Sequence, residues 1–256
     1  MSNISKAFKN GKAFIPFLTG GDPTIDKTEE YIYKMVEAGA DIIEIGIPFS
    51  DPIAEGPVIQ EANIRALKNG ATPEKIFEMV ERVRLKTQIP IVFLTYLNPV
   101  FNYGYDKFFA RCKKAGVDGI IIPDMPFEEK SELAEEAKSN GIDIISLIAP
   151  TSADRIQMIA KEAQGYVYVV SSLGVTGMRS EIKTDLKSII DLVKQATDVP
   201  AAVGFGINKP EQAEKISKIS DGVIVGSAIV KIIEKYGENA ADEVYKYVKE
   251  MKDSVR

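Results

Sequence analysis

Eight short apolar runs, spread over the whole chain, constrain the fold more than any other feature of this sequence. Each run is rich in Ile, Val or other apolar residues, which is typical of strands buried on both faces of a parallel sheet. The segments between the runs carry apolar residues at helical spacing, as in 128–140 and 185–196. The runs are residues 13–19, 41–47, 90–96, 119–124, 143–149, 165–171, 200–206 and 222–227.

The length of the chain fits eight strand–helix units in an α/β domain. The 256 residues give about 32 per unit, which is the size that a strand and its crossover helix need. No Pro- or Ser-rich linker interrupts the pattern, so we expect residues 1–256 to form a single closed (β/α)8 TIM barrel. The alternative is a doubly wound open sheet, which should carry a Gly-x-Gly-x-x-Gly turn after its first strand. The turn here, Thr19-Gly20-Gly21-Asp22-Pro23, does not match that pattern.

A weak internal repeat supports the repeated units. In 38–41, 115–118 and 140–143 a Gly is followed two residues later by an Asp, and Ser220-Asp221 precedes the last run. The Gly can take the left-handed conformation that ends a helix. We expect each Asp to open a buried strand at the solvent edge.

Composition excludes several kinds of chemistry. The chain has no histidine, so His-based triads and His metal ligands are absent, and with Cys112 as its one cysteine a zinc site is not expected. The formal net charge of −5 argues against nucleic-acid and anionic-membrane partners. We find neither a signal peptide nor a membrane span in the sequence, and the single cysteine favours a cytoplasmic location. Acid–base chemistry must therefore come from Asp, Glu, Lys or Tyr.

Two acids stand where a barrel builds its active site, at the carboxyl end of the second strand. Glu44 lies inside an apolar run, where an acid must be paired or have its pKa raised by the loss of solvent. Glu55 follows eleven residues later in a loop rich in Gly and Pro. A pair of acids there could exchange protons with a substrate, although pairing of Glu44 with Lys or Arg and a solvated Glu55 are the structural alternatives.

The ends of the last two strands carry the features of a phosphate site. Gly204 and Gly206 follow the seventh run, and Gly226 with Ser227 end the eighth and precede a helix over 228–236. Barrels often hold phosphate here, on loop amides and a helix N-terminus. We expect Ser227 to cap that helix and to donate a hydrogen bond. The segment 171–180 has the Ser, Gly and Thr content of a lid over the ligand, or of a plain surface loop.

At these residues the sequence closely resembles the tryptophan synthase alpha-subunit family. The resemblance covers nearly the whole chain. It is most specific in PFLTGGDP (16–23), EIGIPFSDPIAEGPVIQ (44–60), SSLGVTG (171–177), GFGI (204–207) and GSAIVKIIE (226–234). It implies a barrel of the ribulose-phosphate-binding type that cleaves indole-3-glycerol phosphate to indole and glyceraldehyde 3-phosphate by a retro-aldol reaction. It also implies that neither a metal nor an organic cofactor takes part.

The resemblance also implies roles for individual residues. Glu44 matches the family's general acid/base, and Glu55 matches the acid that holds the indole N–H. The family usually has Asp at the second position, so the carboxylate here is one methylene longer. From the sequence alone we expect Glu55→Asp to keep or raise activity. The positions that match the indole pocket and lid are Phe17, Leu94, Tyr96, Ile121, Tyr168, Thr176, Gly177, Phe205 and Ile224, and those that match the phosphate site are Gly177, Gly204, Gly206, Gly226 and Ser227.

The implied partner is the tryptophan synthase beta subunit, in an αββα-type complex. Asp51 and Pro52, with Asn98, Pro99 and Asn102 of the loop 98–104, match the surface that meets it. Two alternatives stay open: a mainly regulatory, ligand-binding subunit with impaired catalysis, and a free-standing lyase that releases indole. An indole-glycerol phosphate synthase or a sugar-phosphate isomerase fits less well, because the eight runs contain no lysine.

Overall fold

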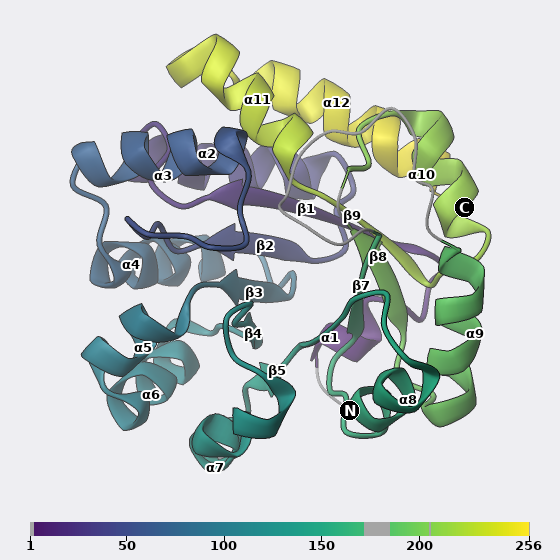
Figure 1. Cartoon of the computed structure of the whole chain (residues 1–256). Helices are drawn as coiled ribbons and strands as arrows, with labels where there is room; N and C mark the ends of the chain where they lie inside the picture. The colour runs from purple at the N-terminus through teal and green to yellow at the C-terminus, as the bar shows by residue number, and fades with distance from the viewer. Residues whose placement is uncertain (1–2, 172–184, 205, 256) are drawn as a thin grey trace.

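The computed structural model describes residues 3–171, 185–204 and 206–255, in which parallel strands form a ring that is surrounded by helices (Figure 1). The strands are β1 (Ala13–Thr19), β2 (Ile43–Gly46), β3 (Ile91–Leu94), β4 (Gly119–Ile121), β5 (Asp143–Ile144), β6 (Ser146–Ile148), β7 (Val167–Val170), β8 (Ala201–Gly204) and β9 (Gly222–Val225). The helices are α1 (Asn3–Lys6), α2 (Ile25–Glu37), α3 (Pro57–Lys68), α4 (Pro73–Arg84), α5 (Leu97–Tyr103), α6 (Tyr105–Ala115), α7 (Ser131–Asn140), α8 (Ala153–Lys161), α9 (Leu186–Ala196), α10 (Pro210–Ser217), α11 (Ser227–Tyr236) and α12 (Ala241–Ser254), with short 3-10 helices η1 (Phe127–Glu129) and η2 (Gly237–Asn239).

The fifth predicted strand is split in two, and this split closes the ring. Residues 143–144 form β5 and pair with β4, whereas residues 146–148 form β6 and pair with β7. Ile145 joins them, and its N–H donates to the carbonyl oxygen of Ile120 at 2.9 Å. β1 pairs with both β2 and β9, and β5 and β6 together count as one strand of the barrel. Each of the eight strands therefore has two neighbours, and the predicted (β/α)8 barrel is confirmed.

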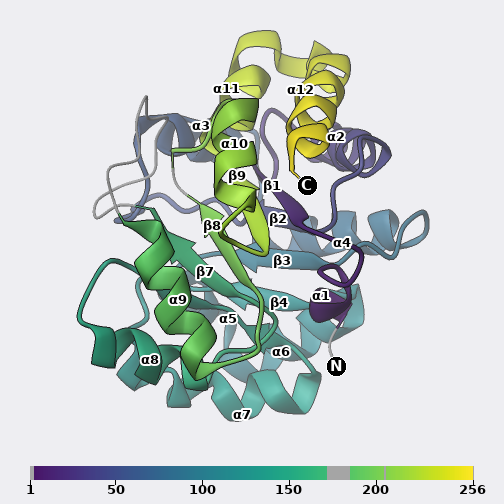
Figure 2. The same cartoon turned by 90° about the vertical axis from the view of Figure 1, so that its right-hand side faces the viewer.

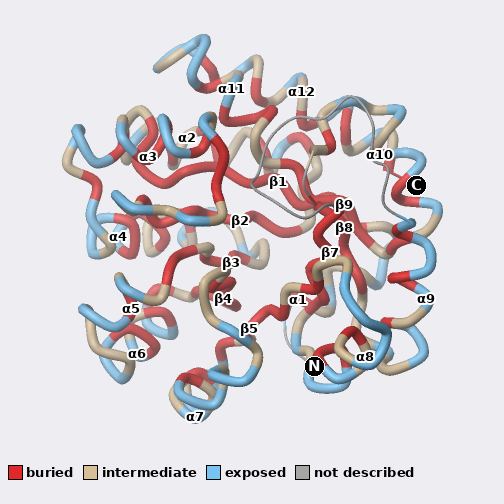
Figure 3. The backbone as a smooth tube through the Cα atoms, in the orientation of Figure 1, coloured by how far each residue is buried: buried red, intermediate tan, exposed pale blue. Residues whose placement is uncertain are grey.

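The alternation of side chains along the strands separates two apolar layers. In β2 and just before it, Ile42 points into the barrel, while Ile43 and Ile45 pack against the helices. Ile4 of α1 is fully buried in the inner layer and so plugs the barrel from the end where the strands begin. Figure 3 shows the result: buried strands at the centre and helices whose outer faces are exposed. This explains why the apolar runs read as nearly continuous in the sequence.

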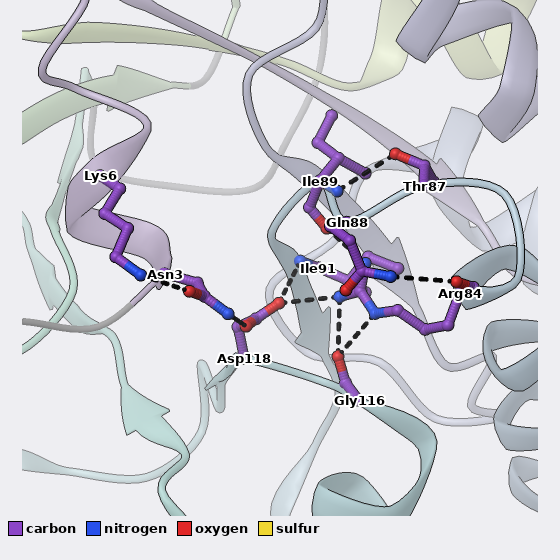
Figure 4. A network of polar contacts seen from close by, with 9 residues as sticks. All are labelled: Asn3, Lys6, Arg84, Thr87, Gln88, Ile89, Ile91, Gly116 and Asp118. Carbon is purple, nitrogen blue, oxygen red and sulfur yellow. Dashed lines mark hydrogen bonds and ion pairs between the residues drawn. The ribbon is translucent and has the colours of Figure 1, made fainter.

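Three of the four repeated Asp residues complete the sheet at the end where the strands begin, and the fourth, Asp143, is the first residue of β5. The backbone N–H of Phe14 donates to Asp41 Oδ2 at 2.7 Å, that of Ile91 to Asp118 Oδ2 at 2.9 Å, and that of Ala201 to Asp221 Oδ2 at 3.0 Å. We call these three residues the ladder aspartates. Each one also has a cation: Lys252, Arg84 and Lys194 respectively. Figure 4 shows Asp118 between Arg84, Asn3 and the start of β3.

The helices end and begin largely as the sequence predicts. Gly39, Gly116 and Gly141 all have positive φ at or next to a helix end. The helix expected from 128 instead begins as η1, with i→i+3 hydrogen bonds, and continues as α7 from Ser131. Figure 2 shows α9 and α10 on the outside of the barrel, with α12 beside α2. No helix among the described residues is long and apolar enough to cross a membrane.

Candidate active site

A narrow, mainly apolar slot opens where the strands end, as expected for a barrel. Its free volume is about 70 Å³. Both predicted acids line it, and they are carried by different parts of the second unit. Residues from the other seven strand–helix units complete the wall. The lining residues are Phe17, Glu44, Ala54, Glu55, Ile59, Leu94, Tyr96, Pro123, Leu147, Tyr168, Gly206, Ile207, Ile224, Gly226 and Ser227.

Glu44 projects from β2 into this slot. It follows Ile42 on the inner face of the strand and lies beside Val92, its partner in β3. Its side chain is almost completely buried, and Oε1 accepts a short hydrogen bond from the hydroxyl group of Tyr166. Burial raises the pKa of Glu44 to about 8, although the bond from Tyr166 opposes this shift. The partner is thus a neutral phenol, and no Lys or Arg of the described residues pairs with Glu44 as the structural alternative required.

Glu55 reaches the slot from the loop before α3. Its Oε2 accepts a hydrogen bond of 2.7 Å from Nδ2 of Asn63, on the buried face of α3. Nε2 of Gln60 donates to the carbonyl oxygen of Glu55 at 2.8 Å and so fixes the backbone there. Burial raises the pKa of Glu55 to about 7, with the Asn63 bond acting against it. The solvated loop acid that the sequence left open is therefore not what the structure shows.

Arg65 fastens α3, and with it Asn63, to the first unit. Its Nε and Nη2 donate to the two carboxylate oxygens of Asp22 at 2.9 and 2.8 Å. Asp22 is buried in the loop after β1. Both acids of the slot are thus held on elements that are themselves tied to the barrel, which is what precise positioning requires.

Two carboxyl groups with pKa values near neutral pH can give and take protons in the same slot. One group can be protonated while the other is ionised, so the pair can act as acid and base without histidine. The mainly apolar walls lower the local dielectric constant and so strengthen each electrostatic contact with a bound ligand.

Most of the other predicted pocket residues also line the slot. Phe17, Leu94, Tyr96, Tyr168 and Ile224 do so. Ile121 does not line it, because it is buried deeper in the inner layer of the barrel. The positions Thr176, Gly177 and Phe205 lie outside the described residues, as does the segment 172–180 of the expected lid.

The glycines expected at the phosphate site have different surroundings. Gly206, Gly226 and Ser227 line the slot at the start of α11. Gly204 does not line it, and the hydroxyl group of Tyr168 occupies the place that a Cβ at this position would need. The expectation that Ser227 caps the helix is wrong. The helix begins one residue earlier than predicted, so Gly226 is the N-cap and Ser227 is the first helical residue.

Several slot residues were missed by the sequence reasoning. Tyr166, the hydrogen-bond partner of Glu44, was missed too, although it lies two residues before the predicted Tyr168, so its inward face could have been read from the alternation of the strand. Asn63 gave no signal, because only the folded α3 brings it to Glu55. The remaining ones are apolar and look like ordinary core residues in the sequence: Ala54, Ile59, Pro123, Leu147 and Ile207.

The positions expected to meet a partner lie at the surface. Asp51, Asn98 and Asn102 are exposed, and Pro52 and Pro99 are partly exposed. Two large apolar side chains beside them are also open to solvent: Ile53 is 72% exposed and Phe101 is 66% exposed. Exposed apolar side chains next to an active site are typical of a contact surface.

Comparison with known proteins gives a consistent result. A family model of the tryptophan synthase alpha chain matches residues 4–256. A tryptophan synthase alpha chain from Lacticaseibacillus casei is 49% identical over 255 residues, which cover 100% of this chain and 96% of that protein. One from Thermoanaerobacter sp. (strain X514) is 46% identical, with 99% of each chain covered.

Solved structures agree with the sequence relatives. The tryptophan synthase alpha chain from Legionella pneumophila superimposes with a TM-score of 0.90 at 35% identity, covering 100% of this chain and 97% of that one. A chain of the tryptophan synthase a2b2 complex from Pyrococcus furiosus gives a TM-score of 0.88 at 39% identity, with coverage of 95% and 99%. On the match to the family model over residues 4–256 and on these relatives, the chain belongs to the tryptophan synthase alpha chain family.

Proposed function

We propose that the chain is a lyase that cleaves indole-3-glycerol phosphate to indole and glyceraldehyde 3-phosphate, as the alpha subunit of tryptophan synthase. The observation that carries this proposal is a pair of buried carboxyl groups, Glu44 and Glu55, which line one apolar slot and have neutral hydrogen-bond partners. Membership of the family supports the same reaction.

The reaction needs an acid at the indole ring and a base at the glycerol chain. Glu44 gives its proton to ring carbon C3, which places a positive charge on the indole nitrogen. The carboxylate of Glu55 accepts the hydrogen bond from that N–H and stabilises the charge as it grows. Glu44 then takes the proton of the neighbouring hydroxyl group, the carbonyl group forms, and the electrons of the broken C–C bond return to the ring.

The rest of the slot orients the substrate. Phe17, Leu94, Tyr96 and Ile224 supply apolar and aromatic surface for a flat ring. Gly206 and Gly226, with Ser227 at the start of α11, are placed to hold the phosphate on backbone N–H groups and a helix N-terminus. Binding at both ends brings the bond to be broken close to the acids.

The first test is Glu44→Gln. The amide cannot exchange the proton, so indole release should fall by at least about 100-fold, the usual range for loss of a general acid or base. Indole is assayed with the beta subunit present, and a thermal unfolding curve checks that the variant folds. A rate within tenfold of the parent would contradict the assignment of Glu44 as the acid.

We further propose that the mouth of the slot docks the beta subunit. The exposed Asp51, Ile53 and Phe101 support this, as does the a2b2 complex formed by the relative from Pyrococcus furiosus. Asp51→Ala should lose most of the acceleration of indole release by the beta subunit, whereas Asp154→Ala, an exposed aspartate on α8, should keep it. Equal acceleration of both variants would discount the loop, and release by the chain alone at the full rate would indicate a free-standing lyase.

A cytoplasmic location, which the single cysteine favours, forms part of this proposal.

A further inference from the structure

A second cavity lies on the other side of the split strand, outside the barrel. It has a volume of about 370 Å³, which is in the range of small-molecule sites. We call it the strand-five cavity. Its floor is the region of β5 and β6, and its sides are η1, the start of α7 and α8. It is lined by Ile122, Pro123, Met125, Pro126, Phe127, Lys130, Ile144, Ile145, Ser146, Leu147, Ala149, Pro150, Thr151, Arg155 and Ile159.

Polar contacts bridge the cavity at its outer edge. Arg155 of α8 forms an ion pair with Glu128 of η1, with Nη1 at 2.7 Å from Oε1. Nζ of Lys130 donates to the carbonyl oxygen of Glu162, at the end of α8, at 3.1 Å. In Figure 1, α7 and α8 lie on either side of β5, and these contacts join α8 and its C-cap to η1 and to the N-cap of α7. The arrangement holds the walls apart instead of filling the space between them.

One buried hydroxyl group in the cavity lacks a partner. Ser146 is 7% exposed and lies on the outer side of β6 with Ile148, while Leu147 points into the barrel. Among the described residues its Oγ has no hydrogen-bond partner. An unsatisfied buried hydroxyl group costs free energy, so such a group is expected to meet a polar atom of a ligand or water.

The charge in the cavity is positive. Glu128 neutralises Arg155, but no carboxylate of the described residues lies within ion-pair distance of Lys130 Nζ, which donates instead to the carbonyl oxygen of Glu162. Partial burial lowers the pKa of Lys130. An anionic group beside Nζ would relieve the loss of solvent around the ammonium group.

We propose that the strand-five cavity binds a small aromatic carboxylate. The ring lies among Met125, Phe127 and the neighbouring prolines, which offer flat apolar surface and a sulfur atom for ring contacts. The carboxylate meets Lys130, and one of its oxygens accepts a hydrogen bond from Ser146. Pro123 and Leu147 line both this cavity and the catalytic slot, so a bound ligand touches the wall of the active site.

Calorimetric titration of the full chain with 2-naphthoate tests this site, with 2-naphthalenemethanol as the uncharged probe of the same shape. Saturable binding of naphthoate to the parent is expected. Lys130→Gln should weaken the binding of naphthoate about tenfold, the usual effect of losing one hydrogen bond to a charged group. The same variant should bind the alcohol as tightly as the parent does. Ser146→Leu, which fills the floor of the cavity, should abolish binding of both probes.

Matched controls keep the result decisive. Lys161→Gln removes an exposed lysine of α8 that does not line the cavity, so it should bind naphthoate like the parent. Ser146→Ala is the substitute if Ser146→Leu does not fold, because it removes the hydroxyl group without adding volume. It should weaken the binding of naphthoate severalfold. No saturable binding, equal weakening by Lys161→Gln, unchanged binding to Lys130→Gln, or displacement of naphthoate by indole-3-glycerol phosphate would each overturn the proposal.

Discussion

Glu44 and Asp22 are both buried acids near the mouth of the barrel, but their partners differ in charge. Asp22 accepts two hydrogen bonds from the guanidinium group of Arg65, whereas Glu44 accepts one from the phenol of Tyr166. Burial raises the pKa of both acids, but at Asp22 the hydrogen bonds and charge of Arg65 oppose the rise, whereas at Glu44 the opposing contact is a neutral phenol and the pKa reaches about 8. The choice of partner therefore separates an acid that fastens elements from an acid that can deliver a proton.

Glu55→Asp tests whether the slot is built for the longer side chain. Loss of one methylene withdraws the carboxylate from Asn63, so the structure leads us to expect a fall in kcat of about tenfold or more, since a shift of about 1 Å can cost 100-fold. This differs from the expectation that the family pattern alone suggested. Steady-state indole release measures kcat and KM, and Asn63→Ala should lower kcat in the same direction. Full activity of Glu55→Asp would show that the loop backbone adapts.

The residues of the slot differ in how far the sequence could reveal them. Glu44 could be predicted as a site residue because burying an acid in an apolar strand costs free energy. Glu55 could be predicted because its loop follows that strand. Asn63 was not visible, because an Asn on a helix has no pattern that marks its partner. Tyr166 was not singled out either, since only the fold brings its hydroxyl group to Glu44.

The predicted strands were in the right places, but all except the first, 13–19, which coincides with β1, were too long. The run 41–47 contains β2 as Ile43–Gly46, because Asp41 turns its side chain to the neighbouring strand and residues after Gly46 leave for the loop. The run 143–149 could not reveal its split, because the break depends on which neighbour each half pairs with. Apolar content reports burial, whereas strand ends depend on backbone pairing that the sequence does not display.

Asp118→Ala should destabilise the chain by roughly 2–4 kcal/mol, because it leaves the N–H of Ile91 without its acceptor and removes the carboxylate partner of the partly buried Arg84, which keeps only the carbonyl oxygens of Gly116 and Ile89. Urea unfolding at neutral pH measures the change. Asp191→Ala, which removes an exposed pair with Lys187 on α9, should cost less than about 1 kcal/mol. The KM for the substrate should stay unchanged in both variants, since neither residue lines the slot. Equal losses of stability in the two variants would show that the hydrogen bond from Ile91 to Asp118 contributes no more than an exposed ion pair.

Glu44 also makes the stability of the entire chain depend on pH. Its pKa is raised from 4.5 to about 8, so between these values the folded chain keeps a proton that the unfolded chain releases. The free energy of unfolding should therefore fall as pH rises through this window and level off above it. Glu55 adds a change of the same sign up to about pH 7.

Urea unfolding of the parent and of Glu44→Gln, at about pH 5.5 and about pH 8.5, separates this contribution from the others. The parent should lose more stability than Glu44→Gln between the two conditions, with a difference on the order of a few kcal/mol. Identical slopes for the two proteins would mean that Glu44 is already ionised in the folded state at the lower pH.

The ladder aspartates lie at the end of the barrel where the strands begin, and the catalytic acids lie at the end where the strands finish. The first set joins neighbouring strands through carboxyl groups that are paired with cations, and the second set lines the slot with carboxyl groups whose pKa values are raised by burial. Substitutions at one end need not disturb the other. An engineer could therefore exchange the loops around the mouth for new specificity and leave the closure of the scaffold intact, provided that the three aspartates and their cations are retained.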